Sequence, residues 1–335
     1  MQAIQLTAPN IDALNITELP RPQPGHGEVL IRQHAVSLNY LDLALATGQF
    51  GAIAQPIIPG ADSAGEIVEL GSGVGGWQIG ERVVPGMMQS WHAGLIRAEH
   101  HHALRGVTDN GGLAEYAVVP AASLVRIPDS LSWQQAATLP IAATTAWNAI
   151  VRGKVQPGST VLLLGTGGVS LFALQYAKAA GARVIMLSSS NEKLARVKAL
   201  GADEAINYRD DPEWDKRVME LTHGQGADLV LESVGAATFA KSISAAAYNG
   251  TIFVIGFVGG AELTVPVLPI MQKMLNIVGN NTGSTEDLQA AVRAIETAGI
   301  VPEVDRVFGF KDTQQAYRYL QSAGHVGKVV IDLSV

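Results

Sequence analysis

The chain contains no cysteine. A disulfide framework, a cysteine nucleophile, an iron–sulfur cluster and a thiolate zinc site are therefore excluded. Charged residues are also scarce, because they make up 16% of the sequence against roughly 25% in an average soluble protein. Hydrophobic residues make up 47% of the 335 residues, and the net charge is only −7. We expect a chain of this composition to fold around packed cores and not to be disordered.

The sequence also lacks a membrane-spanning segment, which would need about 18 uninterrupted apolar residues. Its most apolar stretch, residues 161–182, is broken by glycines, Gln175 and Lys178. No basic segment followed by an apolar one stands near Met1, so no secretory signal is expected. The acidic net charge argues against a nucleic-acid partner, which would need a basic face. A cytoplasmic protein is the expectation.

The first third of the chain is rich in short strand-like runs, such as residues 65–70 and 114–119, separated by glycine and proline clusters. Their spacing predicts a compact β-barrel. The middle third alternates apolar strand-like runs with helical patterns, which indicates a parallel sheet covered on both faces. The six expected strands of this sheet are residues 160–164, 183–187, 204–207, 227–231, 251–255 and 275–278.

The strongest motif lies at residues 161–170, where an apolar strand runs through a glycine turn into a helix. Gly165 permits the sharp turn, Gly167 lets the backbone approach a pyrophosphate, and the helix N-terminus offers free N–H groups. Ser170 stands where the dinucleotide fingerprint has its third glycine. In this context the motif predicts dinucleotide binding, and the alternative is an ordinary strand-to-helix turn. The expected binding residues of the loop are Gly165, Thr166, Gly167, Gly168 and Val169.

The end of the next strand favours NADP(H). An NAD-selective site places an acidic residue about 20 residues after the glycines, where it holds the ribose 2′-hydroxyl. Ser188 occupies that position, and Ser189 and Lys193 follow it. Hydroxyls and an ammonium suit a 2′-phosphate, and no carboxylate stands there to repel it. We also expect one of the three serines at 188–190 to cap the helix that begins near Asn191.

These blocks together resemble the medium-chain dehydrogenase/reductase superfamily, and more closely its zinc-independent, quinone-oxidoreductase-like branch. Beside the glycine loop, the resemblance rests on ordered blocks at residues 24–29, 39–42, 59–65, 111–116, 136–139, 145–147, 200–208 and 327–330. It implies an α/β protein in which a GroES-like catalytic β-barrel, residues 1–122 and 286–335, surrounds a Rossmann domain with a doubly wound parallel sheet, residues 123–285.

Zinc-dependent members of this superfamily hold their catalytic metal with a Cys, a His and a second Cys. The matching positions here are Asn39, Ala61 and Ile141, none of which is a zinc ligand. The four-cysteine structural zinc lobe is also absent. The corresponding stretch, residues 85–110, carries three consecutive histidines at 100–102, and adjacent histidines do not converge on one ion without a third element. We therefore expect no metal site.

The resemblance also implies site residues. Thr145 should touch the nicotinamide ribose, and Lys328 should close the site from the C-terminal end. For each implied residue the alternative is an ordinary loop residue, and for Lys328 it is a solvated charge. The remaining residues implied around the cofactor are Tyr208, Ser233, Val234, Gly256, Phe257, Asn280, Asn281 and Thr282.

Hydride transfer without zinc needs the cofactor and the acceptor to be held in the right geometry, and it needs a group that polarises the acceptor. Asn39 is the first candidate and Tyr40 the second, whereas Asp42 is expected to be a structural partner. Related enoyl reductases use a Tyr as proton donor, where this chain has Phe50. The prediction is an NADPH-dependent reductase of quinones or α,β-unsaturated carbonyls. The alternatives are a zinc-independent NAD(P)-dependent alcohol dehydrogenase or carbonyl reductase, and a non-catalytic NADP-binding protein.

The apolar stretch at residues 263–278 predicts a homodimer. It carries too few charges for a free sheet edge, which proteins usually protect. Two such edges paired across a twofold axis would hide each other. The alternative is that a helix of the same chain covers the edge.

Overall fold

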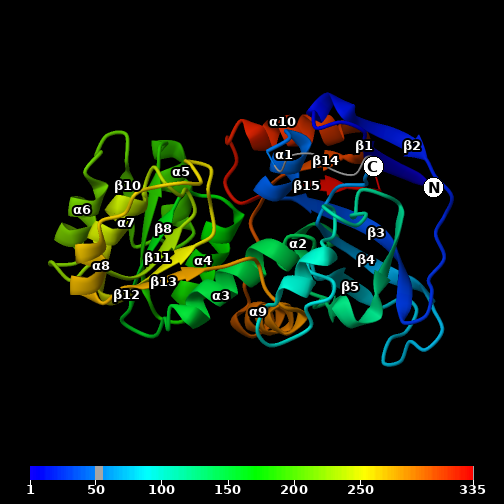
Figure 1. Cartoon of the computed structure of the whole chain (residues 1–335), viewed down its shortest axis with the longest axis horizontal. Coiled ribbons are helices and arrows are strands. Elements are labelled where there is room, and N and C mark those ends of the chain that lie inside the picture. The colour runs from blue at the N-terminus through cyan, green and yellow to red at the C-terminus, as the bar shows by residue number, and fades with distance from the viewer. Residues whose placement is uncertain (50–55, 335) are drawn as a thin grey trace. The chain divides into compact units, whose positions relative to one another are not determined.

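The computed structural model describes residues 1–49 and 56–334 (Figure 1). The chain divides into two compact units, each with its own core. The terminal unit consists of Met1–Thr144 and Thr282–Val335, and the central unit of Thr145–Asn281. Phe50, which bears on the proton-donor argument, lies outside the described residues.

The central unit is built on a six-stranded sheet in the order β10-β9-β8-β11-β12-β13, in which every neighbouring pair is parallel. This confirms the predicted doubly wound parallel sheet. The strands are β8 (Thr160–Leu164), β9 (Arg183–Ser188), β10 (Glu204–Asn207), β11 (Ala227–Glu232), β12 (Ala246–Val254) and β13 (Asn276–Gly279). The helices are α3 (Thr144–Arg152), α4 (Gly168–Ala179), α5 (Asn191–Ala199), α6 (Trp214–Leu221), α7 (Phe239–Ala245) and α8 (Val267–Lys273).

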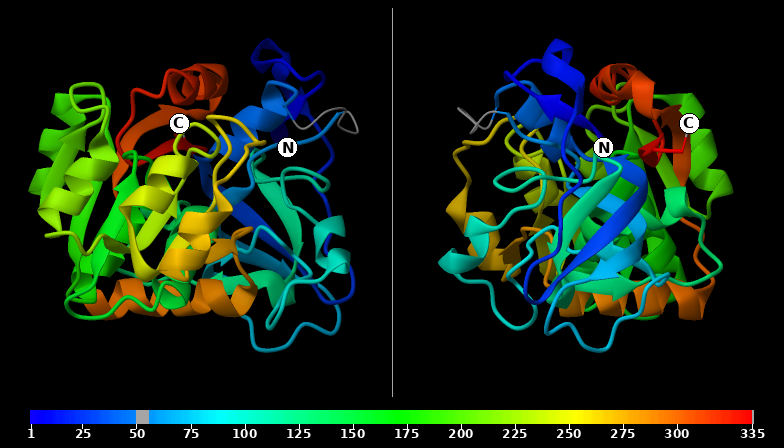
Figure 2. Two further views of the ribbon diagram at one scale, coloured as in Figure 1. Left: turned by 60° about the vertical axis from the view of Figure 1, so that its left-hand side comes forward. Right: turned by 90° about the vertical axis from the view of Figure 1, so that its right-hand side faces the viewer.

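Both faces of this sheet are buried. Leu162 and Leu164 of β8 pack in one cluster with Trp214 of α6 and Phe239 of α7. Successive strand residues point to opposite faces, and Leu163, between them, is also fully buried. Strands covered on both sides explain why the sequence reads as continuous apolar runs here and not as alternation. Figure 2 shows the helices packed around the sheet from two further directions.

The terminal unit is a seven-stranded, mainly antiparallel sheet in the order β14-β15-β3-β4-β5-β7, with β6 on β3 and a separate β1–β2 hairpin. Its strands are β1 (Gln2–Leu6), β2 (Leu14–Glu18), β3 (Glu28–Leu38), β4 (Asp62–Leu70), β5 (Arg82–Pro85), β6 (Tyr116–Pro120), β7 (Leu124–Arg126), β14 (Val304–Gly309) and β15 (Lys328–Asp332). Its helices are α1 (Tyr40–Ala46), α2 (Trp133–Ala136), α9 (Thr285–Ala298) and α10 (Thr313–Gln321), with a π-helical turn at Leu139–Ala143.

The two ends of the chain meet in this unit. β15 pairs antiparallel with β3, so that Val329 lies opposite Leu38, and α10 lies beside the N-terminal hairpin (Figure 1). The first boundary comes later than the sequence suggested. Residues 123–144 belong to the terminal unit and not to the central one, because β7 pairs with β5 and Trp133 stacks on His34 at a centroid distance of 4.3 Å.

Among the described residues, no helix is long and apolar enough to cross a membrane.

Candidate functional site

The carboxyl ends of all six central strands lie along one edge of the sheet, because the strands are parallel. The strand order reverses between β8 and β11. Ligands of open α/β sheets bind outside the carboxyl ends of the strands, at such a switch point. The predicted cofactor residues that end or follow these strands are Gly165 (β8), Ser188 (β9), Tyr208 (β10), Ser233 (β11), Gly256 (β12) and Asn280 (β13).

The glycine turn has the geometry that pyrophosphate binding requires. Gly165 has a φ of 80°, which L side chains rarely adopt. Gly167 is the N-cap of α4. A Cβ built at either glycine would meet no atom within 4 Å, so open space lies in front of the turn. The twelve-residue helix α4 directs its unpaired N–H groups and positive dipole end toward this space. The residues present therefore fit a dinucleotide.

Two serine hydroxyls fix this turn to its neighbours. The last carbonyl of β8, that of Leu164, accepts hydrogen bonds from Ser170 Oγ at 3.1 Å and from Ser233 Oγ at 2.7 Å. Ser170 thus ties the first turn of α4 to the strand at the position where the fingerprint has a third glycine. Ser233 ties the loop after β11 to the glycine turn, which joins the two sides of the switch point.

The corner predicted for a 2′-phosphate is assembled from β9, β10 and α5. Ser188 is 4% exposed, and its Oγ accepts from the backbone N–H of Ser190 at 3.3 Å. Tyr208, whose ring is 43% exposed, donates its backbone N–H to the Ser188 carbonyl. Ser190 is the N-cap of α5 and accepts from Lys193 N. The expected serine cap is therefore Ser190, whereas Ser188 is buried and Ser189 half-buried beside it.

The loop after β11 is held by Glu232, a residue that the sequence reasoning did not select. Its carboxylate is fully buried. Oε1 accepts from the backbone N–H groups of Val234 and Gly235, both at 3.0 Å, and from Thr238 Oγ1 at 2.7 Å. Oε2 accepts from Ser242 Oγ. One carboxylate thus satisfies four donors and fixes the loop that carries Ser233 and Val234.

The loop after β12 runs directly against that loop. A Cβ on Gly256 would lie 1.8 Å from the carbonyl oxygen of Ser233, so only glycine permits this approach. Phe257 follows it and is 42% exposed. After β13, Asn280 donates its backbone N–H to Val254 O. Asn281 is the last residue of the central unit.

Two further predicted residues lie at the unit boundaries. Thr145, in the first turn of α3, is 4% exposed. Thr282 belongs to the terminal unit, has a φ of 54°, and donates its hydroxyl to the carbonyl of Pro140 at 3.4 Å.

A second polar cluster lies in the terminal unit around Asn39, the N-cap of α1. Asn39 Nδ2 donates to Asp62 Oδ2 at 2.9 Å, and Asn39 Oδ1 accepts from Lys328 Nζ at 2.5 Å. Lys328 Nζ also donates to the carbonyl of Leu38 at 2.8 Å. The alternative that Lys328 is a solvated charge is wrong, since the residue is only 4% exposed. β15 carries it against β3, and that pairing brings the two ends of the chain together.

Asp62 and Lys328 contact this amide directly, and a third buried charged group, Arg105, interacts with Asp62. Burial raises the pKa of Asp62 to about 7 against the opposing effect of the Lys328 ammonium. Burial lowers the pKa of Lys328, and the carboxylates of Asp62 and Asp42 act in the opposite direction. Arg105, also fully buried, donates to Ser63 Oγ at 3.0 Å, and burial lowers the pKa of its guanidinium to about 10. Charges buried this deeply normally have partners or a function.

Asp42 has the structural role that was expected of it. Its Oδ2 accepts from the backbone N–H of Asn39 at 2.8 Å, which caps α1, and its Oδ1 accepts from Ala61 N at 3.1 Å. Tyr40 begins α1, and its hydroxyl donates to Gln49 Oε1 at 2.7 Å.

Two of the three positions that match zinc ligands, Asn39 and Ile141, donate to the same carboxylate. Asp62 Oδ2 accepts both from Asn39 Nδ2 and from the backbone N–H of Ile141, at 3.2 Å. The side chains of Ala61 and Ile141 offer no lone pair, so these residues do not fit a catalytic zinc ion. Within residues 1–49 and 56–334, no three His, Cys, Asp or Glu side chains are grouped to hold a metal, and the His100–His102 run lies on an exposed turn.

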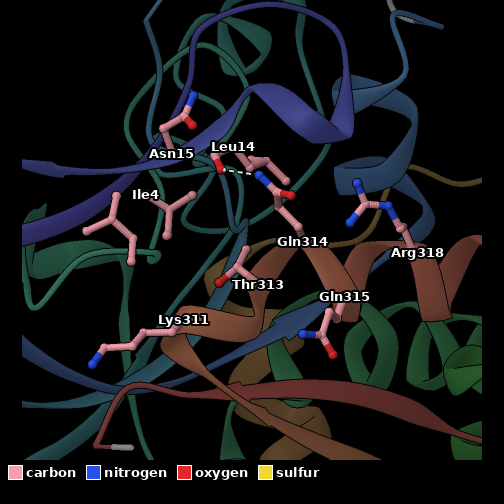
Figure 3. A pocket seen from close by; sticks show the side chains of 9 residues that line it. Ile4, Leu14, Asn15, Lys311, Thr313, Gln314, Gln315 and Arg318 are labelled. Atoms are coloured by element: carbon pink, nitrogen blue, oxygen red, sulfur yellow. Dashed lines mark hydrogen bonds between the residues drawn. The ribbon is translucent and has the colours of Figure 1, made fainter.

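A shallow pocket of about 430 Å³ lies elsewhere in the terminal unit, between β1, β2 and α10 (Figure 3). Gln314 Nε2 crosses it to the carbonyl of Leu14 at 2.9 Å, and Arg318 pairs with Asp12. None of the predicted site residues lines this pocket.

Comparison with known proteins identifies the family of the chain. The sequence pattern of the alcohol dehydrogenase GroES-like domain matches residues 25–129, and that of a zinc-binding dehydrogenase matches residues 168–297. A zinc-type alcohol dehydrogenase-like protein of Schizosaccharomyces pombe, C1773.06c, is 42% identical over 332 residues, which cover 96% of each chain. The chain belongs to the medium-chain dehydrogenase/reductase family. It is accordingly an NAD(P)-dependent oxidoreductase, as the strand-end site indicates.

Solved structures with the same fold include enzymes named for two different activities. A thermostable alcohol dehydrogenase from Pyrobaculum aerophilum is 30% identical with a TM-score of 0.86, and the match covers 99% of both chains. A quinone oxidoreductase from Pseudomonas syringae pv. Tomato DC3000 is 28% identical with a TM-score of 0.84, and the match again covers 99% of both chains. This medium-chain reductase therefore shares its fold with both classes.

Proposed function

We propose that this medium-chain reductase is NADPH-dependent and reduces quinones or α,β-unsaturated carbonyls without a metal. The observation that carries the proposal is the arrangement at the three positions where zinc relatives have ligands. Asn39 there presents a side-chain amide held by Asp62 and Lys328, and Ala61 and Ile141 cannot ligate a metal. An oriented hydrogen-bond donor would replace the metal as the group that polarises the acceptor.

The preference for NADPH rests on the corner around Ser188. No carboxylate stands at the end of β9, and the Ser188 and Ser189 hydroxyls and the Lys193 ammonium follow one another there. A 2′-phosphate carries about −2 charge and three acceptor oxygens, so these donors suit it better than they suit a bare hydroxyl.

In this scheme bound NADPH supplies the hydride to the acceptor carbon. The protein binds the pyrophosphate at the N-terminus of α4 and orients the acceptor oxygen toward Asn39 Nδ2. That N–H donates to the oxygen as negative charge develops on it, and a proton from solvent completes the reduction. The Tyr40 hydroxyl donates to Gln49 and is not aimed as a proton donor. This favours quinones, whose reduced oxyanion is delocalised and needs little acid assistance.

A zinc-independent alcohol dehydrogenase or carbonyl reductase is the second candidate. The names of the S. pombe and P. aerophilum relatives favour alcohol dehydrogenase activity, and they do not speak for its independence of zinc. A non-catalytic NADP-binding protein is the third. The three differ in turnover. With NADPH and a panel of quinones, enones and aldehydes, we expect NADPH oxidation fastest with quinones. Reduction of aldehydes but not of quinones or enones, together with oxidation of alcohols by NADP⁺, would favour the second candidate. Binding of NADPH without turnover would favour the third.

We also propose a cytoplasmic homodimer joined along β13. This strand is the edge of the central sheet, with no partner on its outer side among the described residues. Val267, Met271 and Met274 are 63%, 66% and 70% exposed, and Ile277 of β13 is 44% exposed. Helix α8 packs on β12 and α7. An apolar edge of this kind is protected when it pairs with its symmetry mate.

A further inference from the structure

The side chain of Lys328 holds the Asn39 amide of the proposed active site. We propose that Lys328 is a positioning residue, which with Asp62 locks the Asn39 amide and strengthens its N–H as a donor to the acceptor oxygen. In this role a buried ammonium, reached through an amide, supplies the polarisation that a metal supplies in zinc relatives. The inference rests on the proposed function.

The hydrogen bonds fix which way the amide points. Lys328 Nζ has only donors, so the atom of Asn39 that faces it must be Oδ1. Asp62 faces the other end of the amide and accepts from Nδ2. The side chain therefore has one allowed orientation. Nδ2 carries a second hydrogen, for which no acceptor is found in the described part of the chain, and this is the donor left for a substrate.

Hydrogen bonds and strand pairing also fix the position of the Lys328 ammonium. Two of its three donors go to Asn39 Oδ1 and to the Leu38 carbonyl, from the strand end immediately before Asn39. The antiparallel register of β15 with β3 sets Val329 opposite Leu38, so the ammonium and the amide come from neighbouring backbone positions. Asp62 likewise receives the backbone N–H of Ile141 as well as Asn39 Nδ2.

A cation on the oxygen of an amide draws electron density from its nitrogen. Hydrogen bonds in such a chain strengthen one another, and more so where the surroundings exclude water. Lys328 is 4% exposed, so its charge is shielded from solvent. A neutral side chain of the same length would pack here at less desolvation cost, which makes a purely stabilising role a weak reason for the charge.

A double-mutant cycle on kcat tests this role. We expect Asn39→Ala to lower kcat about 100-fold, the loss typical of one oxyanion donor, and Lys328→Met to lower it about tenfold. If Lys328 acts through Asn39, adding Lys328→Met to Asn39→Ala lowers kcat no further. NADPH affinity should change less than about twofold in all three variants, because no step of this argument involves the cofactor site.

Lys328→Gln keeps a donor for Asn39 Oδ1 but removes the charge, and it serves if Lys328→Met does not fold. We expect it also to lower kcat, by about fivefold, because the polarising charge is gone. Arg82→Met is the matched control: it removes a partly buried cation of the same unit, whose guanidinium donates to the Leu131 carbonyl at 2.6 Å and lies over the Trp133 ring. Its kcat should stay within about twofold of the native value.

A readout without turnover separates this inference from the proposed function. In a complex with oxidised NADP and cinnamaldehyde, the infrared C=O stretch of the aldehyde should shift to lower wavenumber. The shift should shrink in Lys328→Met and vanish in Asn39→Ala. Independent losses in the cycle, or an unchanged shift in Lys328→Met, would overturn the role of Lys328 while leaving the function in place. Failure of the native protein to oxidise NADPH would overturn the function alone.

Discussion

Glu232→Gln should destabilise the central unit and weaken its cofactor site together. The native carboxylate is fully buried and accepts from Val234 N, Gly235 N and two hydroxyls. Glutamine has nearly the same shape. Its Oε1 can keep three of these donors, and its Nε2 can donate to Ser242 Oγ once that hydroxyl turns. What the substitution removes is the negative charge.

The magnitude follows from the number of donors. A hydrogen bond to a charged group contributes about 1.5–3 kcal/mol, against about 1 kcal/mol for a neutral pair. Three bonds to Oε1, each weakened by about 0.5–1 kcal/mol, give a loss of about 2 kcal/mol in the free energy of unfolding. Glu232→Ala leaves all four donors without their partner and should cost about 4 kcal/mol or more.

Urea unfolding followed by circular dichroism measures the loss, and NADPH fluorescence titration measures the site. We expect NADPH affinity to fall several-fold in Glu232→Gln, because the loop that carries Ser233 and Val234 loses its anchor. Glu204→Gln is the control: Glu204 pairs with Arg183 at a half-exposed position, where such pairs contribute about 0–1 kcal/mol. A Glu232→Gln protein as stable as the native one, within about 0.5 kcal/mol, would refute this reasoning.

Three further outcomes are expected. Ser188→Asp should lower NADPH affinity about 30-fold through roughly 2 kcal/mol of repulsion with the 2′-phosphate; Ser188→Asn, without the charge, should lower it far less, and native protein that binds NADH more tightly would contradict the assignment. Val278→Arg in β13 should convert the dimer to a monomer, as measured by light scattering. Val301→Arg, at an exposed position of the terminal unit, should leave the dimer intact. A native protein that is monomeric at micromolar concentration would contradict the proposed dimer. Asp62 has a folded pKa of about 7, above its unfolded value, so the native state holds a proton that the unfolded state releases. Its contribution to stability is therefore present at low pH and is lost at about 1 kcal/mol per pH unit as pH rises from about 4 to 7; Asp62→Asn should flatten this slope, and an unchanged slope would show that Asp62 does not titrate there.

The central unit could be predicted strand by strand, because its signals are local. Apolar runs such as residues 160–164 and 204–207 match β8 and β10 in both bounds. The strands of the terminal unit were harder to predict from the sequence. β14 and the β1–β2 hairpin have weak local patterns and are fixed by strand pairing, β1 with β2 and β14 with β15. The same reason explains the boundary, since residues 123–144 are attached by β7 and by the stacking of Trp133 on His34.

The predicted site residues differ in the same way. The glycine turn and Ser188 carry local motifs, and the parallel sheet brings them to one edge. Glu232 and Asp62 have no motif of their own, and their importance appears only when burial and partners are known. Lys328 has a hydrogen bond to Asn39 and one to Leu38, which lie 289 and 290 positions earlier in the chain. Contacts between residues so far apart in the chain cannot be recognised from a local pattern in a single sequence.

The central claim is hydride transfer from NADPH to a quinone without a metal. The most direct measurement is NADPH oxidation by 1,4-benzoquinone, on protein whose metal content is known from elemental analysis, before and after treatment with EDTA. The account predicts turnover at the same rate in both samples, with less than about 0.1 zinc per chain, because Asn39, Ala61 and Ile141 cannot ligate zinc. Activity that disappears with EDTA and returns with one equivalent of zinc would contradict it.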